Sequence, residues 1–552
     1  MKKMLWLFCL TVRCLFIQAQ TVSKDLNANW TFRRAQSPTW FKATVPGTVH
    51  TDLMANKIIP DPYYRDNEKK VQWVSQDDWE YKGTFTSDSN LLQKNHIELV
   101  FEGLDTYADV YLNNHLILQA NNMFRTWRID VKPFLQKQNT ITVYFKSAER
   151  IADSLAKASP LNHPSDNSRN YVRKAQYHFG WDWGPKFVTC GIWRKITLNS
   201  WNEESEHQEA PFQKTDNHIQ LIQEPDSIGQ SFYFTVNRKP TFIKGANWIP
   251  ADMFLPRITH AKYRELLTTA KEAGINMLRV WGGGIYEDDY FYTLCDSLGI
   301  MVWQDFMFAC AMYPGDDAFI ENVKQEAIDN IKRLRVHPCI AVWCGNNEVD
   351  EGWNNWEWKK QFLAKPEDSI KVWNEYKKLF HELLPQLVKE LDGRPYITTS
   401  PAVSWTKKES LTAADCHYWG VWWGLEPIET YAQKVPRFMS EYGMQAMPNW
   451  ETIEKFSVKE DWDTSSDVMK VHQKHPTGYK NLAVYLEQNN LHPKTFQEYV
   501  TATQEVQSRA LRIAITAHIA AQPNCMGTIF WQFNDCWPVA SWSILDYYGG
   551  KK

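Results

Sequence analysis

The stretch Ile340-Ala-Val-Trp-Cys-Gly-Asn-Asn-Glu348 is a short apolar run that stops at a cluster of polar residues ending in a glutamate. A second stretch about ninety residues later, Arg437-Phe-Met-Ser-Glu441-Tyr-Gly, has the same form. Such runs are typical of buried parallel strands that present a side chain at their carboxyl end. In a β/α barrel, that end of the strands carries the chemistry. We therefore predict two barrel strands, each placing one glutamate in a site.

The sequence around these two stretches predicts the remainder of a barrel. From Phe242 onward, strand-like runs alternate with stretches of helical periodicity, such as Tyr263–Ala273, Ile320–Leu334, Val372–Leu391 and Gln504–Ala521. The eight strand candidates are Phe242–Gly245, Met277–Val280, Ile300–Trp303, Ile340–Cys344, Tyr396–Thr399, Asp415–His417, Phe438–Ser440 and Thr528–Trp531. Eight strands in this order predict a (β/α)8 TIM barrel over residues 241–552. Glu348 then follows the fourth strand and Glu441 ends the seventh.

The first part of the chain has a different pattern. Over residues 20–200, short alternating runs such as His96–Phe101 and Thr140–Phe145 are separated by turns, and Asn113-Asn114 is typical of a tight hairpin. These features predict an N-terminal antiparallel β-sandwich. Residues 201–240 are polar and carry one or two strand-like pieces, too little for an independent domain.

Composition limits the classes of partner and the compartment. The net charge of −3 is spread without a basic block, which argues against nucleic acid, while 27 tryptophans fit a carbohydrate binder. Residues 1–19 have the charged start and apolar stretch of a signal peptide, and no other segment is a candidate to span a membrane. We expect a periplasmic or secreted protein. The cysteines after the signal show neither metal spacing nor a disulfide framework, which predicts buried free thiols.

Two carboxylates at one end of a barrel are what cleavage of a glycosidic bond requires. One protonates the leaving oxygen, and the other attacks the sugar or activates water. A glutamate that ends a barrel strand can also be a member of a structural ion pair. The pair at the fourth and seventh strands, with Asn347 directly before Glu348, favours the catalytic interpretation. The sequence therefore predicts a glycoside hydrolase that needs no metal or organic cofactor.

With these residues assembled, nearly all of the chain after residue 19 resembles the β-mannosidases of glycoside hydrolase family 2. The resemblance rests on several motifs in the family's order: Val45-Pro-Gly-Thr-Val-His50, Asp61-Pro-Tyr-Tyr64, His178-Phe-Gly-Trp-Asp-Trp-Gly-Pro185, Arg279-Val-Trp-Gly-Gly-Gly284, Gly345-Asn-Asn-Glu348, Ser440-Glu441-Tyr442 and Phe530-Trp-Gln-Phe-Asn534. It implies an exo-acting enzyme that removes terminal β-mannose from oligosaccharides with retention of configuration. Alternatives are a family 2 β-galactosidase or β-glucuronidase, or an inactive carbohydrate-binding fragment.

The resemblance also implies a role for each site residue. Glu348 is the expected general acid/base and Glu441 the expected nucleophile, with Arg279 keeping Glu441 ionised and Asn347 holding the sugar 2-hydroxyl. Asp182 is expected to reach from the sandwich into the barrel mouth and hold a non-reacting hydroxyl. The other expected pocket residues are Trp281, Trp356, Trp405, His417 and Trp531. Alternatives remain for several of them: a turn for Asp182, barrel-floor pairing for Arg279 and core packing for the tryptophans.

The chain departs from the family pattern in two places. About 40 residues, 201–240, stand where family members carry an immunoglobulin-like domain of about 100 residues, which suggests a shortened remnant. After Trp531 only a short segment follows, so the last barrel helix is expected to be missing or incomplete. We expect this loss to leave apolar surface on the first and eighth strands without cover.

Overall fold

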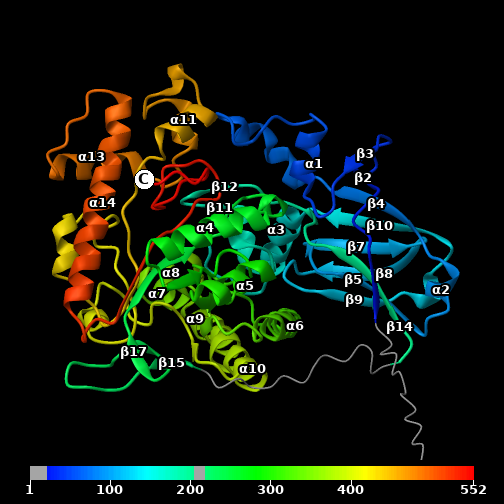
Figure 1. Cartoon of the computed structure of the whole chain (residues 1–552), viewed down its shortest axis with the longest axis horizontal. Helices are drawn as coiled ribbons and strands as arrows, with labels where there is room; N and C mark the ends of the chain where they lie inside the picture. Colours follow the sequence, from blue (N-terminus) through cyan, green and yellow to red (C-terminus); the bar gives the residue numbers. More distant parts are fainter. Residues whose placement is uncertain (1–20, 204–217) are drawn as a thin grey trace, which may run out of the picture.

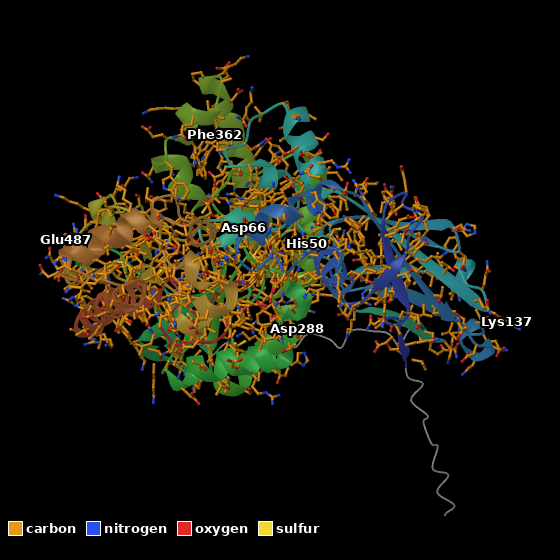
Figure 2. All side chains as sticks on the ribbon, turned by 90° about the horizontal axis from the view of Figure 1, so that it is seen from above. His50, Asp66, Lys137, Asp288, Phe362 and Glu487 are labelled. Atoms are coloured by element: carbon orange, nitrogen blue, oxygen red, sulfur yellow. The ribbon has the colours of Figure 1, made fainter. Side chains whose placement is uncertain are left out.

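The computed structural model describes residues 21–203 and 218–552. They form two lobes, an antiparallel sandwich and a parallel barrel, that lie along the long axis of the molecule (Figure 1). Seen from above, Lys137 marks the far end of the sandwich, Glu487 the opposite end of the barrel lobe, and His50 lies between them (Figure 2). The predicted fold class is confirmed. The predicted signal peptide, residues 1–19, and residues 204–217 of the polar segment lie outside the described residues.

The sandwich packs a six-stranded antiparallel sheet against a four-stranded one. The strands of the two sheets are β1 (Val22–Asp25), β2 (Trp30–Arg34), β3 (Phe41–Ala43), β4 (Trp79–Thr86), β5 (His96–Phe101), β7 (Tyr107–Leu112), β8 (His115–Asn121), β9 (Trp127–Asp130), β10 (Gln138–Lys146) and β14 (Ile196–Trp201). Burial alternates along β7 and β10, because successive side chains of a strand point to opposite faces. Asn113 and Asn114 both have positive φ between β7 and β8, which confirms the predicted hairpin.

Shorter elements join the sandwich strands and reach toward the barrel. They are α1 (Val49–Ala55), α2 (Ser89–Leu92), α3 (Ala148–Ala158), β6 (Leu104–Asp105), β11 (Phe179–Trp181), β12 (Gly184–Lys186) and β13 (Gly191–Ile192). β11 and β12 pair with each other as a two-stranded hairpin, with Asp182 and Trp183 at its turn. This hairpin is the part of the sandwich that contributes to the site.

The barrel consists of eight parallel strands in chain order. They are β18 (Ile243–Trp248), β19 (Met277–Val280), β20 (Met301–Asp305), β21 (Ile340–Cys344), β22 (Tyr396–Ile397), β23 (Cys416–His417), β24 (Met439–Glu441) and β25 (Gly527–Phe530). Each matches one of the eight predicted strands. Backbone pairing runs around the ring except between β22 and β23. There the hydroxyl of Ser400 donates to the carboxylate of Asp415 at 2.6 Å, so side chains join the two strands.

Helices surround the barrel where the sequence shows helical periodicity. They are α4 (His260–Glu272), α5 (Asp289–Leu298), α6 (Asp317–Leu334), α7 (Val349–Asn355), α8 (Trp358–Phe362), α9 (Pro366–Lys377), α10 (Leu384–Leu391), α11 (Trp450–Phe456), α12 (Asp467–Val471), α13 (Gly478–Gln488) and α14 (Phe496–Ala520). A π-helical turn, Lys378–Leu383, joins α9 to α10, so the predicted helix Val372–Leu391 is continuous. α14 starts at Thr495, whose side chain accepts a hydrogen bond from the backbone N–H of Glu498 in a capping box.

A small antiparallel sheet closes the amino-terminal end of the barrel. Its strands β15 (Ile219–Ile222), β16 (Tyr233–Val236) and β17 (Lys239–Thr241) come from the segment in which one or two strands were expected. Phe232 and Phe234 from this sheet contact the rings of Trp303 and Phe438 on the barrel strands. The short segment therefore supplies apolar cover for the barrel floor.

The described chain carries no helix after β25, yet the neighbouring strands are covered. Ala246 on β18 and Phe530 on β25, which lie on the outer face of the barrel, are buried, so the expectation of exposed apolar surface on the first and eighth strands is wrong. Two features account for the difference. The sheet β15–β17 packs beneath both strands, and residues 531–552 fold back over the barrel mouth, where the hydroxyl of Tyr547 donates to Asp252 at 2.6 Å.

The first prediction tests whether the small sheet supports the barrel. Phe234→Ala should lower the free energy of unfolding by about 3–5 kcal/mol, because it removes a buried ring and leaves a cavity beneath the strands. Urea denaturation followed by tryptophan fluorescence measures the change. Ile228→Ala, at an exposed position of the same segment, should stay within about 0.5 kcal/mol of the parent. Equal small losses in both variants would show that the sheet is dispensable.

Candidate active site

The carboxyl ends of the barrel strands bring the two predicted glutamates to one rim. Glu441 is the last residue of β24, and Glu348 lies directly before α7, after β21. Carboxylate oxygens of the two residues lie within 4.8 Å of each other. Glu348 has a φ of 59°, in the left-handed region that a residue with a side chain rarely adopts. The surrounding structure holds this backbone in place, and such strain is found at functional sites.

His417 lies between the two carboxylates. Its Nδ1 atom is 2.8 Å from Oε1 of Glu348 and 3.6 Å from Oε2 of Glu441. Burial lowers the pKa of His417 to about 4, so the ring is neutral near pH 7. The guanidinium of Arg279 can only donate, and it lies 3.3 Å from Nε2. The hydroxyl of Ser400 lies 2.9 Å from the same Nε2 atom, so both ring nitrogens have polar partners.

Arg279 is fully buried below the rim and donates hydrogen bonds to several residues of the site. It donates to Glu441 at 3.0 Å and to Asp305 at 2.9 Å. It also donates to the side-chain oxygens of Asn347 at 2.8 Å and Asn247 at 3.2 Å. These partners come from β18, β20, β24 and the segment after β21. One guanidinium therefore fixes side chains from four places on the rim.

The surroundings assign different protonation states to the two glutamates. Burial raises the pKa of both Glu348 and Glu441 to about 7, and two carboxylates this close share one proton near neutral pH. Arg279 forms an ion pair with Glu441 and has no direct contact with Glu348. This ion pair favours the ionised form of Glu441, so the proton resides on Glu348. The site thus offers one acid and one anion.

Glu348, His417 and Glu441 are also close enough together to share a metal ion. Among the described residues they are the one cluster of this kind. The fixed positive charge of Arg279, in contact with both His417 and Glu441, opposes a second cation at that point. The arrangement suits proton transfer and nucleophilic attack better than metal binding.

A cavity of about 860 Å³ opens above the two glutamates. All the pocket residues predicted from the sequence line it except Arg279, which lies beneath: Asp182, Trp281, Asn347, Glu348, Trp356, Trp405, His417, Glu441 and Trp531. Cavities of this size bury most of a small ligand. The sequence-based residue set therefore converges on one pocket.

Tryptophans from both lobes form one wall of the cavity. The ring of Trp281 lies 4.8 Å from Trp181, 5.5 Å from Trp183 and 5.4 Å from Trp531, all edge to face. Trp183 is fully buried, and its carbonyl accepts a hydrogen bond from the indole of Trp537. Trp281 and Trp531 are almost completely buried and still line the cavity. They therefore belong both to the hydrophobic core and to the wall of the cavity. This cluster anchors the β11–β12 hairpin in the barrel mouth.

Asp182 lies at the turn of that hairpin and faces the cavity. Burial raises its pKa to about 8, and the negative charges of Glu348 and Glu441 add to the rise. Its carboxyl accepts a hydrogen bond from the backbone N–H of Asp182 itself, and none joins it to another residue of the described chain. The carboxyl therefore lines the cavity without a partner from the barrel.

Trp356 and Trp405 also line the cavity. Both are partly buried, and the ring of Trp405 packs edge to face against Tyr418. Their side chains come from the end of α7 and from the loop after β22. They offer apolar surface to a ligand in the cavity.

Several residues that line the cavity were not predicted from the sequence. They are Glu68, Arg169, Cys310, Glu351, Trp419, Trp423, Lys474 and Trp542, among others. Lys474 pairs with Glu68 of the sandwich, far away in the sequence. Glu351 lies one helical turn after Glu348, and that spacing is the one signal that could have identified it. The others come from loops whose sequence gives no indication of where they fold.

The chain is similar to known proteins over most of its length. Residues 30–194 match the family model described as the glycosyl hydrolase 2 galactose-binding domain-like domain. The chain is 31% identical to a β-mannosidase of Rattus norvegicus, over 96% of this chain and 74% of the relative. It is 32% identical to β-mannosidase B of Aspergillus fumigatus, over 95% and 75%. The crystal structure of a β-D-mannosidase from Dictyoglomus thermophilum superposes with a TM-score of 0.90 at 36% identity, over 96% of this chain and 76% of that one.

The second prediction concerns the buried charge of Arg279. Arg279→Leu should lower the free energy of unfolding by about 3–5 kcal/mol at pH 7, because it leaves Asp305 and Glu441 buried without their cation. The loss should shrink as the pH falls, since both carboxylates then take up protons and no longer need the charge. Urea denaturation at pH 7 and pH 5 measures both effects. Arg34→Leu, which removes a surface pair with Asp77, should cost at most about 1 kcal/mol at either pH. A loss independent of pH would contradict the ion-pair role.

Proposed function

The chain belongs to the β-mannosidases of glycoside hydrolase family 2, and on that premise we propose that its barrel pocket hydrolyses terminal, non-reducing β-D-mannose residues. The observation that carries the proposal is the closeness of the two carboxylates, since an oxygen of Glu348 and an oxygen of Glu441 lie within 4.8 Å of each other. Retaining glycosidases hold their carboxyl groups about 5–5.5 Å apart, whereas inverting enzymes need about 6.5–9.5 Å to admit a water. The short distance supports a double displacement through a covalent glycosyl-enzyme.

In the first step, Glu441 attacks the anomeric carbon of the bound mannoside. The C–O bond to the leaving group breaks, and Glu348 gives its proton to the departing oxygen. Arg279 keeps the attacking oxygen ionised until the bond forms. Formation of the covalent bond removes the negative charge of Glu441. The pKa of Glu348 therefore falls, because that charge no longer opposes its ionisation. Glu348 is left as a carboxylate in contact with Nδ1 of His417.

In the second step, Glu348 acts as the base. It takes a proton from a water molecule, whose oxygen attacks the anomeric carbon and releases Glu441. Two displacements on the same carbon retain the β configuration. Asn347, whose side-chain oxygen is occupied by Arg279, turns its amide N–H groups away from the guanidinium. We assign that amide to the sugar 2-hydroxyl, where a hydrogen bond strengthens in the transition state.

The β11–β12 hairpin supports an exo mode of action. It brings the carboxyl of Asp182 and the indole of Trp181 to the cavity from the sandwich. A carboxyl group that hydrogen-bonds a sugar hydroxyl there would fix the terminal residue and prevent a longer chain from passing through. Trp356 and Trp405, which also line the cavity, would then contact the remainder of the oligosaccharide.

The pocket's charges disfavour one alternative substrate. A β-glucuronide would bring a carboxylate close to Glu441, which the site keeps ionised. Two cations of the cavity wall are already paired, Lys474 with Glu68 and Lys186 with Glu149. Like charges in a partly desolvated site repel strongly. A β-galactoside is neutral and is not disfavoured by this argument, so it belongs among the substrates tested.

We also propose that the protein acts in the periplasm or outside the cell. The charged start and apolar run of residues 1–19 support export, although these residues lie outside the described part of the chain. All the cysteines of the described residues are free, and all but Cys310 are buried. No helix among the described residues combines the length and apolarity needed to span a membrane.

The third prediction is the turnover of a chromogenic substrate. Purified protein should release nitrophenol from nitrophenyl β-mannoside, and Glu441→Ala should reduce kcat/KM by about a thousandfold or more, because no carboxylate remains to form the intermediate. The release of nitrophenol is followed by absorbance. Turnover of nitrophenyl β-galactoside but not of the mannoside would contradict the sugar specificity. Folded protein that binds mannosides without turnover would identify an inactive carbohydrate binder.

A further inference from the structure

Resting on the proposed function, we propose that Cys310 is a positioning residue for the general acid/base, holding one carboxyl oxygen of Glu348 through a thiol hydrogen bond. The sulfur of Cys310 lies 3.4 Å from Oε2 of Glu348. His417 contacts the other oxygen, Oε1. Each oxygen of the acid/base therefore has its own partner, one from the segment after β20 and the other from β23.

The thiol is also connected to the cation below the rim. Arg279 donates to the oxygen of Asn347, and the amide nitrogen of Asn347 lies 3.4 Å from the sulfur of Cys310. The contacts thus run from Arg279 through Asn347 and Cys310 to Glu348. A second route runs from Arg279 through His417 to the same carboxyl. Arg279, which pairs with the nucleophile, is thereby linked to both oxygens of the acid/base.

The backbone fixes the thiol in this position. The N–H of Cys310 donates to the carbonyl of Asn347 at 2.9 Å, and the N–H of Asn347 donates to the carbonyl of Phe308 at 2.9 Å. Cys310 has a φ of 45° and Glu348 a φ of 59°, both in the left-handed region. Two non-glycine residues with this strained conformation face each other across one pair of strands, which is a reason to assign the contact a function.

A thiol suits a carboxyl group that changes its protonation state in each cycle. His417 contacts Oε1, and Oε2 is the oxygen beside the sulfur. The sulfur can accept from an O–H group on Oε2 while Glu348 is an acid, and the S–H can donate to Oε2 when Glu348 is a carboxylate. Both are weak hydrogen bonds, so neither state is held too firmly to react. The donated bond favours the carboxylate and moderates the rise of the pKa caused by burial.

Other charged groups also act on Cys310 and Glu348, and all of them are present in the parent protein and in each variant at position 310. They are Arg169 and Asp182 from the sandwich, Arg279 from β19, Glu351 from α7, His417 from β23 and Glu441 from β24. None of them is altered by a substitution at Cys310. A shift in the titration of Glu348 caused by that substitution therefore reports the thiol contact itself.

The fourth prediction tests the contact through activity. In Cys310→Ala, the alkaline limb of the pH profile of kcat/KM should move upward by about half to one pH unit, because the carboxylate of Glu348 loses a donor and keeps its proton to higher pH. Cys310→Ser, whose hydroxyl is a stronger donor, should keep the limb at or below its original position. Cys295→Ala removes a buried thiol far from the cavity and should not move the limb. Coincident alkaline limbs in the parent protein, Cys310→Ala and Cys310→Ser would overturn the proposal.

A second measurement needs no substrate, so it separates failure of this proposal from failure of the proposed function. Iodoacetamide alkylates a cysteine when the thiolate sulfur displaces iodide, forming a C–S bond, and the thiol proton goes to water. At pH 8, alkylation of Cys310, located by mass spectrometry, should be about three- to tenfold faster in Glu348→Gln, because the neutral amide no longer opposes the thiolate. Glu505→Gln, at an exposed position that does not line the cavity, should leave the rate unchanged. Equal rates in the parent protein and Glu348→Gln would overturn the contact, even if mannoside turnover is absent.

Discussion

The catalytic end of the barrel is organised around the buried charge of Arg279. A guanidinium without access to water must find enough acceptors to replace its hydration. It finds them in Asn247, Asp305, Asn347 and Glu441, which come from different parts of the rim. Satisfying this one cation therefore sets the positions of the nucleophile and of the residue before the acid/base. The same charge makes the two glutamates unequal, so one can be an anion while the other holds a proton.

The second constraint is the interface between the sandwich and the barrel. The cavity is not a property of the barrel alone, because the sandwich hairpin β11–β12 supplies Trp181 and Asp182 to its wall. Apolar contact between Trp183, Trp281 and Trp531 holds this hairpin, and buried ion pairs such as that of Arg173 with Glu326 join the lobes elsewhere. Loss of the sandwich would therefore remove part of the substrate site as well as stability.

Strand positions and the catalytic pair could be predicted from the sequence, because both depend on local patterns. β19 and β21 begin and end where predicted, whereas β18 extends past Gly245 to Trp248, since its last residues are polar or aromatic and break the apolar run. His417 was expected only as a pocket residue, and its position between the glutamates depends on contacts across the ring. Cys310 and Lys474 could not be predicted, because their partners are 38 and 406 residues away. The cover of the barrel floor by Phe232 and Phe234 is likewise a long-range packing result.

The most direct test of the double displacement is the configuration of the mannose that is released first. Proton NMR of the anomeric signals during hydrolysis of a β-mannoside distinguishes the two anomers before they interconvert. If Glu441 forms a covalent intermediate, β-mannose appears first and the α anomer follows only through mutarotation. If α-mannose appears first, Glu441 activates water in a single displacement, and the short distance between the two carboxylates does not describe the working enzyme.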